Sequence, residues 1–282
     1  MTASETSAGA PMRIGTVALT VRDLDTVSHF YQQVIGLAPV ETGTGRVRLG
    51  VGDEVLLELR HDPSAPLADR RSAGLFHNAF LLPTRADLAQ WLLHAAELRV
   101  FLQGASDHLV SEAIYLADPE GNGIEVYWDR PSERWEWHNG QVRMNTLPLD
   151  LDSLVATAKR KWSGLPAGSL IGHVHLQVGA LDRAEAFYAG LLGLDVVCHY
   201  PGATFFSTGG YHHHIGTNIW NSRGAPVRPE PVTGLVDVEL LADAATFAAL
   251  RARLPEERAA EATATRLPLR DPWGTSLTVV AR

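Results

Sequence analysis

Cysteine is almost absent from this chain, and long apolar runs are absent altogether. Cys198 is the single cysteine in 282 residues, so no intramolecular disulfide can form. This usage is typical of a reducing cytoplasm, where we expect the protein to work. No stretch reaches the roughly 18 uncharged apolar residues that a membrane-spanning helix needs, which predicts no membrane partner. Residues 1–12 are small and polar, and they predict a flexible tail without the apolar centre of a signal peptide.

Basic residues are in the minority. The chain has 24 Lys and Arg against 32 Asp and Glu, which gives a formal net charge of −8. A nucleic acid would be repelled on average, and no local run of basic residues compensates, so we expect no nucleic-acid partner. The length is sufficient for two medium-sized domains.

An internal repeat is the strongest pattern that is present. Residues 14–37 and 171–194 are identical at 11 of 24 positions without a gap. Each copy begins with alternating apolar residues, which is typical of a half-buried strand. A Leu-Asp pair follows, and we expect its carboxylate, Asp25 or Asp182, to cap a helix that a later glycine ends. Each copy is therefore predicted to be a strand followed by a helix.

A weaker repeat lies within each half of the sequence. Residues 74–82 match 234–242 as apolar strands, and each is followed by an amphipathic helical pattern. Residues 118–127 match 271–280, where Asp-Pro turn chemistry precedes another strand. The chain is thus predicted to contain four strand–helix–strand–strand–strand (βαβββ) modules. They start near residues 14, 75, 171 and 233.

Four such modules predict an α+β fold in which mixed sheets curl into cups and the helices lie outside. Consecutive modules are expected to form two domains, residues 13–128 from the first and second modules and residues 170–282 from the third and fourth. Residues 129–169 form a connector. Its several tryptophans predict that it packs on a domain.

Candidate metal ligands appear when the four modules are compared at their first and last strands, which line the cups. The second module places His77 and Glu125 there, and the third places His173, whereas the first offers Thr16 on its opening strand. A lone histidine at a strand start is more often a hydrogen-bonded structural residue. Two imidazoles and one carboxylate, however, are the facial triad of non-haem iron(II) sites, which leaves coordination positions open. We therefore predict a metal site between the two middle modules.

Two more polar residues precede Glu125 in the sequence. Tyr115 lies ten residues earlier, and a hairpin through the turn DPEGNG would bring it beside Glu125. His108 lies a further seven residues back. An imidazole there could act as a general acid or base, and the tyrosine hydroxyl could bind an oxyanion or phenolate. The alternatives are an aromatic core residue and a surface-loop histidine.

Three consecutive histidines occupy residues 212–214. On a strand, His212 and His214 would point one way and His213 the other, so all three could not bind one metal. We expect this segment to contribute to the substrate pocket, with His213 and His214 as candidate acid–base residues and His214 also as a further possible ligand. The residues predicted to line the pocket are His212, Trp220, Trp128 and Phe205.

These segments together resemble the vicinal oxygen chelate superfamily of glyoxalases, bleomycin-resistance proteins and extradiol dioxygenases, from about residue 13 to the C-terminus. More narrowly, the chain is similar to the bacterial catechol-2,3-dioxygenase family. The segments that carry this similarity include LFHNAFLLPTRADLAQWL, QGASDHLVSEAIYLADPEGNGIEVYWDRP, GLPAGSLIGHVHLQV and GGYHHHIGTNIW.

This resemblance implies an extradiol ring-cleaving dioxygenase that takes a catechol or related aromatic diol together with O2. It implies Fe(II), or Mn(II) or another divalent metal, held by two His and one Glu, with a catalytic Tyr ten residues before the Glu. His77, His173, Glu125 and Tyr115 match this pattern, and a homo-oligomer is compatible with it.

Two other functions remain open at this point. One is a glyoxalase-like isomerase or lyase that uses Zn, Ni or Mn, which a second carboxylate in the site, such as Glu58, would favour. The other is a non-enzymatic small-molecule (drug) binder, which would be favoured if His77 and Glu125 pointed away from each other.

Overall fold

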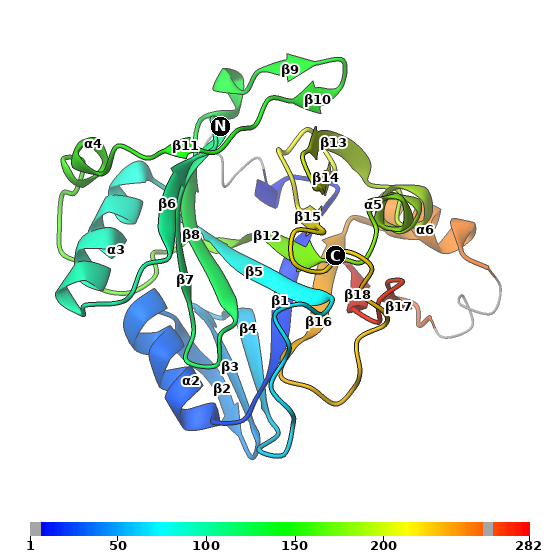
Figure 1. The fold of residues 1–282 in the computed structure, drawn as a ribbon, viewed down its shortest axis with the longest axis horizontal. Coiled ribbons are helices and arrows are strands. Elements are labelled where there is room, and N and C mark those ends of the chain that lie inside the picture. The colour runs from blue at the N-terminus through cyan, green and yellow to red at the C-terminus, as the bar shows by residue number, and fades with distance from the viewer. Residues whose placement is uncertain (1–6, 256–261) are drawn as a thin grey trace.

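The computed structural model describes residues 7–255 and 262–282, and it confirms the predicted α+β fold of curled mixed sheets with helices outside (Figure 1). Of the predicted tail, residues 1–6 lie outside the described residues. The remainder is packed on the protein, because Ser7 and Ala10 are buried and the Met12 backbone N–H donates to Thr208. Within the described residues, no helix has the length and apolarity that crossing a membrane requires.

The first and third modules have the same order of elements. The first module consists of β1 (Met12–Val21), α2 (Leu24–Phe30), η1 (Tyr31–Ile35), β2 (Ala38–Gly43), β3 (Arg46–Val51) and β4 (Glu54–His61). The third consists of β12 (Leu170–Gln177), α5 (Leu181–Glu185), η3 (Ala186–Leu191), β13 (Asp195–Tyr200), β14 (Ala203–Ser207) and β15 (Ile215–Asn218).

The second and fourth modules carry the longer helices. The second consists of β5 (Gly74–Leu81), α3 (Arg85–Glu97), β6 (Gly104–Asp107), β7 (Ser111–Ala117) and β8 (Gly123–Asp129). The described part of the fourth consists of β16 (Gly234–Ala242), α6 (Ala244–Arg253), β17 (Arg266–Arg270) and β18 (Ser276–Ala281).

The helix ends follow the predicted chemistry only in part. Gly36 has φ +87° and ends η1, as expected for a residue that adopts the left-handed conformation. The predicted caps are wrong. Asp23, not Asp25, accepts from the Thr26 backbone N–H at 2.9 Å, because Asp25 already lies in the first turn of α2. The helix α5 has no side-chain cap, and Asp182 lies inside its first turn.

The two middle modules pair with each other, and the first module pairs with the fourth. A nine-stranded sheet, in the order β11-β6-β7-β8-β5-β12-β15-β14-β13, joins the second and third modules. A seven-stranded sheet, in the order β17-β18-β16-β1-β4-β3-β2, joins the first and fourth. The predicted ranges 13–128 and 170–282 therefore do not coincide with the sheets, since each sheet takes one module from each range.

The connector lies against the nine-stranded sheet. It contains η2 (Ser132–Arg134), β9 (Trp137–His138), β10 (Gln141–Val142), β11 (Leu147–Pro148) and α4 (Leu151–Val155). Its strand β11 hydrogen-bonds to β6 and extends that sheet, and the Trp135 indole N–H donates to the Arg130 carbonyl.

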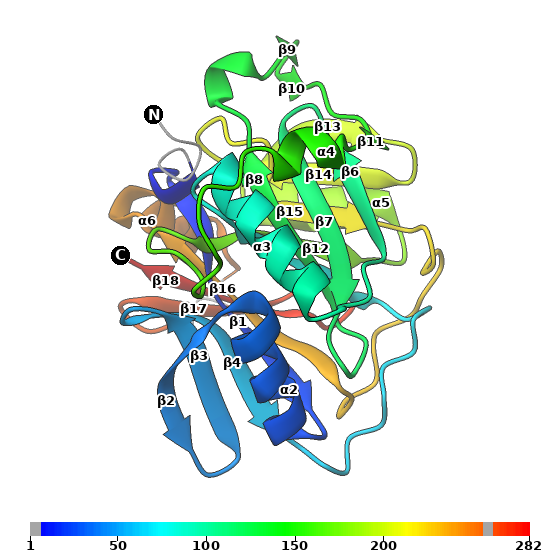
Figure 2. The same cartoon turned by 90° about the vertical axis from the view of Figure 1, so that its left-hand side faces the viewer.

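Each sheet turns an apolar face towards its helices. Figure 2 shows α3 across the strands β7 and β8, and α2 across the first-module strands. Successive strand residues alternate between faces, so Ile124 and Val126 of β8 enter the main core, whereas Glu125 between them faces the other way. The second face is thereby left for polar groups, and in the nine-stranded sheet it carries the candidate site.

Candidate metal centre

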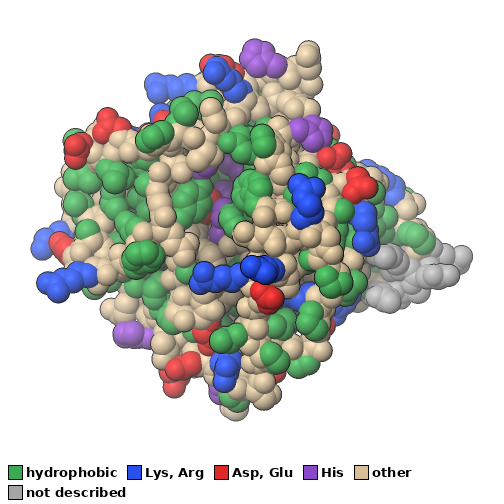
Figure 3. Space-filling view, in the orientation of Figure 1, with side chains coloured by type: hydrophobic (Ala, Val, Ile, Leu, Met, Phe, Trp, Pro, Cys, Tyr) green, Lys and Arg blue, Asp and Glu red, His purple; other side chains and the backbone are tan. Residues whose placement is uncertain are grey.

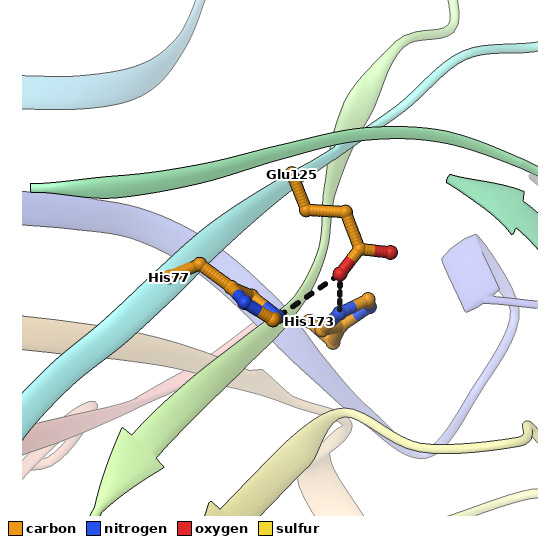
Figure 4. A group of neighbouring side chains, drawn as sticks. All are labelled: His77, Glu125 and His173. Carbon is orange, nitrogen blue, oxygen red and sulfur yellow. Dashed lines mark hydrogen bonds and ion pairs between the residues drawn. The ribbon is translucent and has the colours of Figure 1, made fainter. Parts of the chain in front are cut away.

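Three side chains from neighbouring strands converge on the polar face of the nine-stranded sheet. His77 Nε2 lies 3.0 Å from Glu125 Oε2, and His173 Nε2 lies 3.3 Å from the same oxygen. Figure 4 shows both rings turned towards that carboxylate oxygen. One ligand atom from each residue lies within 4.8 Å of the others, and all three residues are buried. The structure thus brings together the three predicted ligands.

The strand register explains this convergence. The strand β5 lies between β8 and β12, and Ala79 is the residue opposite both Glu125 and His173. His77 is two residues earlier, on the same face of β5. The small side chain of Ala79 leaves the space between its two neighbours open.

The charge state of the cluster suits a cation. Burial raises the pKa of Glu125, but the adjacent imidazoles of His173 and His77 outweigh it and hold the pKa well below its usual value. Burial lowers the pKa of His173 to about 4, although Glu125 opposes the shift. An ionised carboxylate and a neutral imidazole are the forms that bind a divalent metal.

Buried nitrogens of this cluster are left without a hydrogen-bond partner. Within the described residues, His77 Nε2 makes no hydrogen bond although Glu125 Oε2 lies 3.0 Å away, and His173 Nδ1 has no hydrogen-bond partner; both nitrogens are inaccessible to solvent. A buried polar atom without a partner costs free energy unless a ligand occupies its lone pair or its proton finds an acceptor. The three residues therefore fit a resident divalent metal, with His77, His173 and Glu125 as its protein ligands.

A cavity of about 360 Å³ opens above the cluster. Figure 3 shows the hollow on this face of the molecule, with histidine side chains at its floor between hydrophobic ones. This volume suits a small aromatic molecule. The side chains that line it include Phe76, His108, Tyr115, Met144, His175, Phe205, His213 and Trp220.

Tyr115 and His108 form a hydrogen-bonded pair in the cavity wall. Tyr115 is directly opposite Glu125 in the β7–β8 ladder, as the hairpin argument predicts. Its hydroxyl lies 2.6 Å from His108 Nε2, and His108 Nδ1 lies 2.8 Å from the Asn145 carbonyl. A carbonyl only accepts, so Nδ1 carries the proton, and in the neutral ring Nε2 accepts from Tyr115. Burial, with the Glu125 carboxylate, raises the pKa of Tyr115 well above its usual value and keeps the phenol protonated.

Only the middle one of the three consecutive histidines lines the cavity. The His213 ring lies 4.1 Å from that of His173, measured between centroids. His212 lies behind it, with Nδ1 2.7 Å from His213 Nδ1 and Nε2 2.7 Å from Asp129 Oδ1. Burial lowers the pKa of His213 well below its usual value, so this ring is neutral.

The expected roles of His212 and His214 at the cavity are therefore corrected. His214 Nδ1 lies 3.1 Å from Ser207 Oγ, and its ring packs on Tyr211 away from the cavity. The physical reason is that the strand β15 begins only at Ile215. The preceding histidines lie in a bent connection, where strict alternation of side chains does not apply.

Two of the three aromatic residues predicted for the pocket lie in the cavity wall. Phe205 and Trp220 line the cavity, but Trp128 does not. Trp128 is three residues after Glu125 on the same strand, an odd spacing that places it on the opposite face, where it packs against the main core.

His175 is a residue that the sequence argument missed. It follows His173 by two residues on β12, lies opposite His77 and is only 4% exposed. Its Nε2 has no hydrogen-bond partner in the described part of the chain, and its ring packs against those of Phe205 and Trp220. The spacing His-Val-His on a strand could have revealed it, because residues two apart share a face.

The second carboxylate considered for this site is elsewhere. Glu58 lies on β4 of the seven-stranded sheet, where Arg48 donates to it at 2.8 Å and Arg60 at 2.6 Å. Within residues 7–255 and 262–282, the group that could hold a metal contains one carboxylate, Glu125.

The fold and the buried His–Glu–His group identify the class of the protein. The sequence matches the model of the Glyoxalase/Bleomycin resistance protein/Dioxygenase superfamily over residues 13–126 and 170–275, so the chain belongs to this superfamily. It is 44% identical over 237 residues to the catechol-2,3-dioxygenase of Bacillus subtilis, a match that covers 82% of each chain.

Two more distant similarities agree with this assignment. The chain is 26% identical over 165 residues to biphenyl-2,3-diol 1,2-dioxygenase 3 of Rhodococcus globerulus, which covers 56% of this chain and 86% of that one. The crystal structure of glyoxalase I from Zea mays aligns with a TM-score of 0.57 at 14% identity, over 98% of this chain and 95% of that one. The latter similarity shows the fold alone.

Proposed function

We propose that this protein is a metal-dependent extradiol dioxygenase that cleaves the ring of a catechol or a related aromatic diol with O2. The observation that carries the proposal is the buried His77–Glu125–His173 group at the floor of an aromatic-lined cavity. The identity of 44% to a catechol-2,3-dioxygenase supports the same reaction class.

The metal proposed for this site is Fe(II), with Mn(II) or another divalent cation as the alternative. Two neutral nitrogens and one carboxylate leave coordination positions for both substrates. A bound iron would supply Lewis acidity and electron transfer between diol and O2. The single carboxylate leaves the site with one positive charge, which favours an anionic diol.

The residues around the cluster would bind and orient the diol. The flat cavity walls of Phe205 and Trp220 would hold an aromatic ring, and the lone pairs of the Tyr115 oxygen would accept a hydrogen bond from a substrate hydroxyl. Because the Tyr115 hydroxyl is hydrogen-bonded to His108 Nε2, a proton that reaches the tyrosine oxygen can be passed on to that nitrogen. His213, at the cavity wall, is the second candidate acid–base residue, and its lowered pKa makes it a weaker proton acceptor than an ordinary imidazole.

Oxygen consumption tests this proposal directly. The purified protein, loaded with Fe(II) under anaerobic conditions, should consume O2 with at least one member of a panel of substituted catechols and form a coloured semialdehyde. Matched preparations of His77→Ala and His173→Ala should not. No O2 uptake with any catechol by a protein that demonstrably retains iron would overturn the proposal.

The two other functions make different predictions. A glyoxalase-like isomerase or lyase would turn over without O2. The Glu58 carboxylate that would have favoured it is held in the other sheet by Arg48 and Arg60. A drug-binding protein without a metal would not need the convergence of His77 and Glu125.

A further inference from the structure

The seven-stranded sheet has a polar hollow of its own, of about 650 Å³. By the internal repeat, Asp237 takes the position of His77 and Thr278 that of Glu125, and both line this hollow. Thr16 takes the position of His173 but does not line it, and its hydroxyl donates to the Val55 carbonyl. The Asp237 carboxylate accepts hydrogen bonds from the hydroxyls of Ser276 (2.8 Å) and Thr278 (3.1 Å). The positions of His77 and Glu125 in the other sheet are therefore taken here by a carboxylate and by one of its hydroxyl donors.

Guanidinium groups dominate the lining of this hollow. Four arginines line it, against the two carboxylates of Asp237 and Glu230, and one of the four, Arg60, is already paired with Glu58 outside the lining. This excess is notable in a chain whose net charge is −8. We call this site the arginine hollow, and its arginines are Arg60, Arg228, Arg266 and Arg270.

Arg228 is the buried member of the group. The residue is only 8% exposed, and its Nη2 donates to the Leu235 carbonyl. Among the described residues, no carboxylate lies within ion-pair distance of Arg228. Burial lowers its pKa, and the more distant carboxylates of Glu230 and Asp271 offset that shift only in part. A buried cation without a carboxylate partner is costly, and an anion in the hollow would offset that cost.

The exposed arginines at the rim are only partly engaged. Arg270 Nη1 donates to Glu230 Oε1 at 3.1 Å and to the Gly274 carbonyl at 3.0 Å, and within the described residues its other nitrogens make no hydrogen bond. Arg266 and Arg270 both lie on the exposed face of β17, and their side chains are 53% and 59% exposed. Arg266 is held only loosely, with 3.8 Å between its Nη1 and Glu239 Oε2. A guanidinium group presents several N–H donors in a planar fork that matches a carboxylate or a phosphate.

We propose that the arginine hollow is a binding site for a small organic oxyanion, a carboxylate or a phosphate ester, distinct from the metal centre. Arg228 holds the anion at the base, and Arg266 and Arg270 hold it at the rim. The Asp237 carboxylate discriminates in favour of an anion that also carries a hydroxyl donor. This site belongs to the sheet that does not carry the metal ligands, so it does not depend on the proposed ring cleavage.

Calorimetric titration of the full chain tests this site. Inorganic phosphate and succinate are titrated separately at constant ionic strength, and one saturable binding event is expected for at least one of them. The arm that binds identifies the phosphate or the carboxylate chemistry. Arg266→Gln/Arg270→Gln should weaken binding about tenfold or more, because two charge-assisted hydrogen bonds are lost.

A matched variant separates a built site from general charge attraction. Arg143 is exposed, is paired with Glu136 and lies outside the hollow, so Arg143→Gln should leave the affinity unchanged. Arg228→Lys keeps the charge but loses the fork, and it should weaken binding while the protein remains folded by circular dichroism. Absence of saturable binding of both anions, or an equal loss in Arg143→Gln, overturns the proposal.

Discussion

Glu125 is the residue on which the candidate metal centre depends most. Both imidazoles approach the same oxygen of its side chain, and it is the only carboxylate in the described metal-ligand group. Glu125→Gln keeps the shape but removes the negative charge that offsets a divalent cation. We expect metal affinity to fall by at least about 100-fold, since even residues that support a ligand contribute 10–100-fold.

Metal content after dialysis, together with titration of Fe(II) or Zn(II), measures this change. Glu136→Gln is the control, because that carboxylate is exposed, is paired with Arg143 and is not a member of the metal-ligand group. Retention of stoichiometric metal by Glu125→Gln would contradict the assigned ligand.

Tyr115 and His108 should act as one unit. Their atoms are 2.6 Å apart, and each loses its partner when the other is replaced. We expect Tyr115→Phe and His108→Gln each to lower kcat about 10–100-fold with a smaller change in KM, with metal content unchanged. The double variant should be no worse than the poorer single variant. Additive losses in this cycle would show that the two side chains act independently.

For single residues, the sequence predicted those positions that the geometry of a short hairpin determines. Tyr115 faces Glu125 because a tight hairpin fixes the register of its two strands. His173 depends on a pairing between β5 and β12 that no local pattern specifies. Trp128 was mispredicted although its odd spacing from Glu125 already excluded it, and His175 was missed although its even spacing from His173 indicated the same face.

At the scale of elements, each Asp-Pro turn is tied to the helix of the preceding module. The Tyr188 hydroxyl donates to Asp271 at 3.0 Å, and the Tyr31 hydroxyl donates to Asp118 at 3.4 Å. These are repeat-equivalent pairs, and each links the two sheets. The conserved positions of Tyr and Asp within the internal repeat thus have a structural cause.

Removing one of these hydroxyls should destabilise the protein. Tyr188→Phe leaves a buried carboxylate with one donor fewer, and we expect a loss of about 1–2 kcal/mol in the free energy of unfolding. Tyr31→Phe, with the longer bond, should cost less. Urea unfolding measures both, and Tyr200→Phe is the control because its hydroxyl makes no hydrogen bond to any of the residues that the structure describes. Equal stability of Tyr188→Phe and the wild type would show that the bond contributes nothing.

The same turn predicts a pH dependence. Burial raises the pKa of Asp271 above its ordinary value of 3.8, against the backbone N–H groups that lower it. The folded protein therefore binds this proton more tightly than the unfolded chain. The associated stability is fully present below pH 3.8 and is lost as the pH rises through the raised pKa.

Comparison with Asp271→Asn isolates this contribution. The difference in unfolding free energy, wild type minus variant, should decrease as the pH rises from about 4. A difference that stays constant or grows with pH would contradict the raised pKa.

Helices and strands were predictable where the spacing of apolar residues stays regular over the whole element, as in α3 and α6. They were less predictable where the chain bends within a few residues. The segment before β15 contains strand-like residues, yet contacts of His212 with Asp129 and of His214 with Ser207 hold it in a bent path. Tertiary contacts of this kind override local preference.

At the scale of the whole molecule, each sheet combines both halves of the sequence. The antiparallel pairs β1–β16 and β5–β12 both span the connector. A protease site inserted at the exposed turn of Asn139 and Gly140, between β9 and β10, would cut the chain between these partners.

After cleavage at that turn, we expect the two fragments to elute together from a size-exclusion column in native buffer and to separate in urea. Two independent domains, made of residues 13–128 and 170–282, would instead separate without denaturant. The internal repeat indicates the number of modules but not which of them share a sheet. Four similar modules can pair in more than one way with similar local interactions.

The nested pairing also orders events during synthesis. All strands of the nine-stranded sheet lie between residues 74 and 218, so the sheet that holds the metal ligands can assemble while the fourth module is still untranslated. The strand β1 emerges first, but its partner β16 follows only after more than two hundred further residues. Pairing the two strands closes a long loop, which is slow. The nascent chain therefore carries an unpaired edge of β1 for most of its synthesis, and it is this edge, not the sheet of the candidate metal centre, that is exposed to misassembly and to chaperones.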